Sequence, residues 1–213
     1  MGVVGFGLFL LYDINSYAWQ CRVLRFGFFI GTMLIAIATL IQCIGACRIG
    51  AFSGGADMVF IMLSILALAA MLYCLFFALP FQETYTNPEN GRKTYTFGVY
   101  ALCRHPGVIC FFAMYLFLGL AALPAKLIGH GMLFSVLNVG YAWFQDRVTF
   151  PKTFCDYEAY RKKAPFLIAT KKSIRRAFQT WGYPYEKEEE LLDSRKNYTN
   201  TPKKRFGKSI VDF

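Results

Sequence analysis

The charged pair Arg104 and His105 stands directly before Pro106, which opens an uncharged run over residues 107–125. Proline suits the first turn of a helix because its missing N–H would have no partner there. A second uncharged run, residues 127–145, follows the short turn "LPAKL" and ends at Asp146. The two runs predict a tight helical hairpin, and this hairpin would bring Arg104, His105 and Asp146 together at one end.

These three side chains are suited to binding and proton transfer. A guanidinium such as that of Arg104 binds a carboxylate through two parallel hydrogen bonds. His105 could hold a ligand or act as a base toward an amine. Two simpler interpretations remain open: Arg104 as an anchor at the membrane interface, and His105 as a residue that only positions the start of the helix.

The elements that position these residues are membrane helices. The chain is 56% hydrophobic and 18% aromatic, with a mean hydropathy of +0.38, which is too apolar for an ordinary soluble domain of this size. Uncharged runs of spanning length cover residues 26–47, 58–81, 107–125 and 127–145. A shorter run, residues 2–12, either completes a fifth span or forms a half-buried segment. We therefore expect an all-α integral membrane protein with four to five transmembrane helices.

The distribution of basic residues predicts the orientation. Every lysine and arginine from Arg147 onward lies on the side of the C-terminus, and an excess of basic residues marks the cytoplasmic side. This places the C-terminus and the proposed site in the cytoplasm. The formal charge of +10 is then best matched to anionic lipid headgroups rather than nucleic acid. The seven cysteines show no paired CxxC spacing, and we expect no metal site.

Polar residues divide the chain into three regions. Residues 1–81 form an N-terminal transmembrane scaffold. Residues 82–181 hold a polar loop, the helical hairpin and a cytoplasmic C-terminal flap, and we expect this region to be catalytic. Within it, "KKSIRRAFQTW" predicts a basic amphipathic helix on the membrane surface. Residues 182–213 form a charged tail that is expected to be mobile.

Two segments carry a resemblance to a known family. "TFGVYALCRHPGV" resembles the T-x-G-x-Y-x-x-x-R-H-P-x-Y signature of the integral-membrane methyltransferases related to isoprenylcysteine carboxyl methyltransferase and phosphatidylethanolamine N-methyltransferase. "FCDYEAYRKKAPFLI" is similar to the segment that ends their catalytic region. The likeness covers roughly residues 80–170. The residues that match the two motifs are Gly98, Tyr100, Arg104, His105, Pro106, Phe154, Tyr157, Tyr160, Arg161 and Pro165.

The resemblance implies an S-adenosylmethionine-dependent methyltransferase. In that family the cofactor binds on the cytoplasmic side, in a pocket closed by the C-terminal segment, and a lipophilic substrate arrives from the bilayer. Asp146 stands where the family has a carboxylate for the cofactor's amino group, whereas Arg147 and Val108 depart from the pattern. Cofactor-binding roles are therefore expected for Gly98, Tyr100, Arg104, His105, Pro106, Asp146, Tyr157, Tyr160 and Arg161, with Arg104 and His105 nearest the chemistry.

Two other functions stay open at this point. Steroid and sterol reductases share a similar histidine-proline turn but use NADPH, whose 2′-phosphate could meet Arg92, Lys93 and Arg147. The departures at Arg147 and Val108 also suit a non-catalytic relative of the methyltransferases. The sequence does not distinguish a carboxylate from an amine as the methyl acceptor, and it does not give the oligomeric state.

Overall fold

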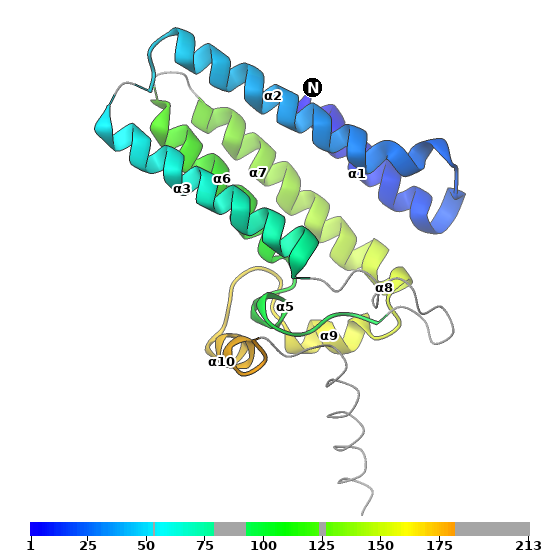
Figure 1. The fold of residues 1–213 in the computed structure, drawn as a ribbon. Coiled ribbons are helices and arrows are strands. Elements are labelled where there is room, and N and C mark those ends of the chain that lie inside the picture. The colour runs from blue at the N-terminus through cyan, green and yellow to red at the C-terminus, as the bar shows by residue number, and fades with distance from the viewer. Residues whose placement is uncertain (53, 79–92, 124–126, 182–213) are drawn as a thin grey trace, which may run out of the picture. The chain divides into compact units, whose positions relative to one another are not determined.

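The computed structural model describes residues 1–52, 54–78, 93–123 and 127–181, and these residues form helices and connecting turns without a strand (Figure 1). The expected charged tail, residues 182–213, and most of the polar loop that follows residue 81 lie outside the described residues. The longer helices are α1 (Gly2–Ile14), α2 (Gly27–Arg48), α3 (Gly55–Leu72), α6 (Pro106–Ala121) and α7 (Leu127–Phe144). The all-α class predicted from the sequence is confirmed for this part of the chain.

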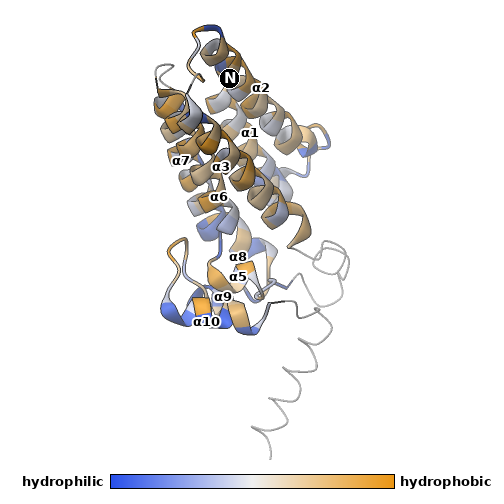
Figure 2. Cartoon of the chain, turned by 60° about the vertical axis from the view of Figure 1, so that its left-hand side comes forward, coloured by the Kyte–Doolittle hydropathy of each residue, from blue (hydrophilic) through white to orange (hydrophobic). Residues whose placement is uncertain are grey.

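Three helical segments of the described residues are long and apolar enough to cross a membrane: Val23–Arg48, Gly55–Phe77 and Leu127–Thr153. Figure 2 shows the hydropathy of the residues along these helices, with hydrophobic residues in orange. They match three expected spans and indicate a multi-pass membrane protein. The expected span at residues 107–125 is shorter than predicted, because α6 ends at Ala121. A proline follows at position 124, and proline disfavours helical backbone in the residue before it.

Helix packing fixes the hairpin that carries the candidate site. α6 packs along α3 on one side and α7 on the other, while α1 packs against α2 and α7. Small residues permit these close approaches. A Cβ atom added to Gly5 would lie 2.7 Å from the Gly31 carbonyl oxygen, and one added to Gly119 would lie 2.8 Å from the Cα of Ile128. The helices α6 and α7 therefore pack closely against each other.

Short helices gather at one end of the long ones, as Figure 1 shows. They are α5 (Val99–Leu102), α8 (Phe150–Thr153), α9 (Tyr157–Lys163) and α10 (Lys171–Gln179). Tyr157, Tyr160 and Ala164 form a small core there. The expected amphipathic helix is present as α10, which packs against α5 through its buried residues Ser173 and Ala177. These elements form a cap over the end of the α6–α7 hairpin.

Candidate functional site

The site is built around the buried carboxylate of Asp146, which is 3% exposed. One guanidinium nitrogen of Arg104, Nη1, lies 2.8 Å from Asp146 Oδ1 and donates to Oδ2 at 3.0 Å. The Tyr157 hydroxyl donates to Oδ1 at 2.6 Å. Arg161 Nε lies farther away, 3.8 Å from Oδ2. The hairpin therefore brings Arg104 and Asp146 together as the sequence predicted.

Local backbone structure positions His105 at the start of α6 and Asp146 after the end of α7. His105 is the residue before the first turn of α6, and Pro106 occupies that turn, as expected from the missing proline N–H. The backbone N–H of Arg104 donates to the Pro165 carbonyl at 2.9 Å, which ties this turn to the segment after α9. Asp146 lies in η5, a π-helical turn over Gln145–Thr149 that continues α7. Such widened turns occur often at functional sites.

His105 is held between aromatic rings and is 7% exposed. Its imidazole stacks on Phe150, with ring centroids 5.8 Å apart, and meets the edge of Phe166 at 5.0 Å. His105 Nε2 lies 3.5 Å from Asp146 Oδ1 but has no hydrogen-bond partner among the described residues. The imidazole is therefore fixed in orientation, with Nε2 buried beside the Asp146 carboxylate and not hydrogen-bonded to any described residue.

Arg104 also keeps an unused donor. Its Nε atom is buried and has no hydrogen-bond partner within the described part of the chain. The guanidinium carbon lies 5.7 Å from the centre of the Phe166 ring. A buried donor without a partner is costly, so this atom and His105 Nε2 both indicate a place for a polar ligand.

The tyrosines of the two motifs act as hydrogen-bond donors. The Tyr160 hydroxyl donates to the Tyr100 carbonyl at 2.7 Å, and the Tyr100 hydroxyl donates to the Cys74 carbonyl at 2.7 Å. Burial, together with the Asp146 carboxylate, raises the pKa of Tyr157 well above its usual range. Burial likewise raises the pKa of Tyr160. Both hydroxyls therefore stay protonated at neutral pH, and both side chains also pack the cap.

A cavity of about 710 Å³ opens beside this cluster. Most of the predicted site residues line it, namely Tyr100, Arg104, His105, Pro106, Tyr157 and Tyr160. From there the cavity runs along apolar side chains of α1, α2 and α3, among them Phe6, Ile35 and Leu72. Its polar end and its apolar length together suit a ligand with a polar head and a hydrophobic chain.

The remaining predicted residues have supporting positions. Gly98 has φ +55° and ψ −126°, a backbone conformation that favours glycine, and its N–H donates to the Thr180 hydroxyl at 3.1 Å. Asp146 and Arg161 lie behind the residues that line the cavity. Arg147 is exposed, whereas Val108 lines the cavity. Of the basic groups considered for NADPH, Lys93 is exposed and Arg92 lies outside the described residues.

Sequence reasoning missed the polar residues that α7 and η5 place on the cavity wall. Asn138, Tyr141 and Gln145 all line the cavity, and their spacing of three and four residues puts them on one helix face. Asp13, at the end of α1, faces Tyr141 and Gln145. The available signal was the presence of polar residues inside an otherwise apolar span, which is costly in a membrane unless they are used.

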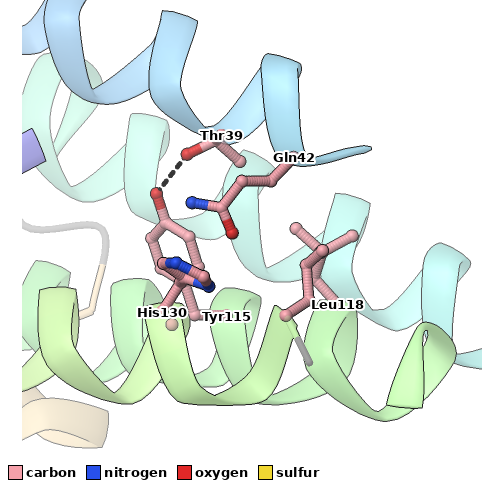
Figure 3. Close-up of a pocket in the computed structure, with 7 residues that line it drawn as sticks. Thr39, Gln42, Tyr115, Leu118 and His130 are labelled. Atoms are coloured by element: carbon pink, nitrogen blue, oxygen red, sulfur yellow. Dashed lines mark hydrogen bonds between the residues drawn. The ribbon is translucent and has the colours of Figure 1, made fainter. Parts of the chain in front are cut away.

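The second histidine, His130, lies away from this cluster. It lines a small cavity of about 10 Å³ together with Thr39, Gln42 and Tyr115, and the Thr39 and Tyr115 hydroxyls share a hydrogen bond there (Figure 3). This volume suits at most one water molecule. His130 is not among the residues that line the larger cavity.

No family model, curated protein or solved structure matches this chain.

Proposed function

We propose that this chain is a membrane-embedded, S-adenosylmethionine-dependent methyltransferase that acts on a lipophilic substrate. The observation that carries the proposal is the cavity, which joins Arg104 and His105 at its polar end to a long apolar wall. A methyl donor with a charged amino-acid part needs the first feature, and a lipid-like acceptor needs the second. The resemblance of the two motifs to the membrane methyltransferases supports the same conclusion.

The residues present fit the cofactor. Arg104 Nε and His105 Nε2 are buried donors or acceptors without partners among the described residues, and both side chains line the cavity. Arg104 would hold the carboxylate of the cofactor's amino-acid part. Asp146 fixes the guanidinium from behind and would therefore act on the cofactor through Arg104. Phe150, Tyr157 and Phe154 offer aromatic surfaces at the same end.

The chemistry asks mainly for orientation and the exclusion of water. S-adenosylmethionine, when bound, supplies a methyl group whose carbon–sulfur bond breaks as the acceptor's lone pair attacks the carbon, and the sulfur keeps the bonding pair. With an amine acceptor, His105 Nε2 is positioned to take the proton that the nitrogen must lose. With a carboxylate acceptor no proton is released, and His105 would serve only to bind and orient.

The site is proposed to face the cytoplasm, because the basic residues of the cap and tail favour that side. In a background without the native cysteines, a cysteine introduced as Ser194→Cys should react with an impermeant reagent only from the cytoplasmic side of sealed vesicles. A cysteine introduced as Ser53→Cys should react only from the opposite side. The reverse pattern would contradict the proposed orientation of the site.

The function is tested by measuring binding of S-adenosylmethionine, S-adenosylhomocysteine and NADPH to the detergent-solubilised protein. We expect both adenosyl compounds to bind and NADPH not to compete with them. The variant Arg147→Ala serves as a control and should bind the adenosyl compounds as the wild type does, since this exposed arginine lies outside the cavity lining. Binding of NADPH alone would favour the reductase alternative, and binding of none of the three would favour a non-catalytic relative.

A further inference from the structure

A second buried carboxylate, Asp13, lies at the end of α1 and is 4% exposed. The side chains of Tyr141, Gln145 and Thr149 face it. Asp13 Oδ2 is buried without a hydrogen-bond partner, and no ion pair of Asp13 occurs within the described segments. A buried carboxylate that lacks a cation is strongly unfavourable, and in a membrane protein such a residue usually marks a ligand site.

This carboxylate determines which atoms its neighbours present to the cavity. Gln145 Nε2 donates to the Tyr141 hydroxyl oxygen at 2.9 Å, and the same amide faces Asp13. Because the amide hydrogens are directed to these protein groups, the atom that remains to contact a ligand is Oε1, an acceptor. Tyr141 and Gln145 both line the cavity. This part of the wall therefore offers acceptor atoms backed by a negative charge.

The rest of the cavity lining contributes little positive charge. Among the described residues that line it, Arg104 and His105 are the basic side chains, and Arg104 is already paired with Asp146. The apolar length of the cavity lies next to the Tyr141 and Gln145 wall, with Phe9, Phe28 and Phe111 close by. A ligand with a hydrophobic chain would place its headgroup against acceptors rather than against free cations.

We propose that Asp13, Tyr141 and Gln145 form a headgroup subsite that selects an amphipathic substrate carrying a protonated amine. That the bound amine is a substrate rests on the proposed methyltransferase function, because the subsite shares its cavity with the proposed cofactor site. The ammonium donates to the acceptors on Tyr141 and Gln145, and its charge compensates Asp13. A long-chain carboxylate would meet the same negative charge and be disfavoured.

The subsite is tested by photo-crosslinking with a long-chain amine that carries a diazirine beside its amino group, using the full chain in lipid nanodiscs. Dodecylamine, dodecanoate and dodecanol serve as competitors. We expect dodecylamine to compete best and the crosslink to map to α1 or α7. Asp13→Asn should raise the concentration of dodecylamine needed for half-competition by roughly ten- to hundred-fold, as expected for the loss of the negative charge behind the acceptors in a low-dielectric site.

Two controls separate the possible results. Asp57→Asn removes a half-buried carboxylate that caps the start of α3, outside the cavity lining, and should leave competition unchanged. Asp13→Glu keeps the charge and should keep the preference for the amine even where Asp13→Asn folds poorly.

Unchanged competition in folded Asp13→Asn, or equal competition by dodecanoate, would overturn the subsite. Binding of S-adenosylmethionine is measured in parallel, so that its absence would reject the proposed function while an amine preference still supported the subsite.

Discussion

The described residues include two buried carboxylates, Asp13 at the end of α1 and Asp146 in η5, and they have opposite surroundings. Asp146 is in contact with Arg104, Tyr157 and, at longer range, Arg161. Asp13 faces hydroxyl and amide groups and has no ion-pair partner within the described residues. Both side chains are almost fully excluded from the surface. Burial alone therefore does not distinguish them, but charge compensation does.

The contrast between Asp146 and Asp13 shows how two buried carboxylates at one cavity can have different roles. Where a carboxylate is already compensated, as at Asp146, its role is to fix the groups around it, and the ligand meets those groups instead. Where a carboxylate lacks a cation, as at Asp13, the ligand itself completes the charge balance. We interpret the Asp146 region as the cofactor end of the cavity and the Asp13 region as the end that selects the substrate.

The largest effect is expected at His105, which belongs to the Asp146 region and has its Nε2 atom 3.5 Å from Asp146 Oδ1. If the acceptor is an amine, His105→Gln should lower turnover by roughly 10²–10⁴-fold while S-adenosylmethionine binding stays nearly unchanged. Single-turnover methylation and cofactor binding, measured on the same preparation, check this. A parallel loss of binding would instead assign His105 to holding the cofactor.

A smaller effect is expected for Asp146→Asn, which keeps the size of the side chain and removes its charge. Arg104 would lose the partner that fixes it, at a cost of about 1.5–3 kcal/mol for a charged hydrogen bond. Affinity for S-adenosylmethionine should fall roughly ten- to hundred-fold. Calorimetric titration would measure this, with Asp57→Asn as the matched carboxylate. Unchanged affinity in a folded variant would remove Asp146 from the cofactor end.

Arg104→Lys is expected to weaken the same end by a smaller factor. The charge is kept, but an ammonium cannot reproduce the fork of a guanidinium, so one charged hydrogen bond is lost. Affinity for the cofactor should fall about tenfold. The measurement is the same titration, with Arg175→Lys on the exposed surface of α10 as control. An unaffected variant would indicate that Arg104 is an interfacial anchor.

The smallest effect is expected on stability at Asp13. Because its carboxylate lacks a cation among the described residues, Asp13→Asn should leave the free energy of unfolding within about 1 kcal/mol of wild type, or raise it. Thermal unfolding in detergent, without ligand, measures this. The contrast between the two carboxylates would be contradicted if Asp13→Asn lowered the free energy of unfolding as much as Asp146→Asn does.

The sequence was sufficient to bring Arg104 and Asp146 together because local rules determine where they lie. Pro106 marks the helix start, and the short connection between two apolar runs brings Arg104 close to Asp146 without knowledge of the tertiary fold. The Asp13 region could not be found in this way. Asp13 meets Tyr141 and Gln145 through the packing of α1 on α7, which depends on side-chain shape and on glycines such as Gly5. The length of α6 was overestimated because hydropathy does not indicate where a helix ends.

The π-helical turn η5 sets which carboxylate each of its side chains meets. A π turn holds about one residue more than an α turn. Gln145 and Thr149 face Asp13, while Asp146, between them in sequence, faces Arg104. Deleting one residue here would rotate one side of the turn by about 100° relative to the other. The register of this one turn therefore keeps the two carboxylates in their separate surroundings.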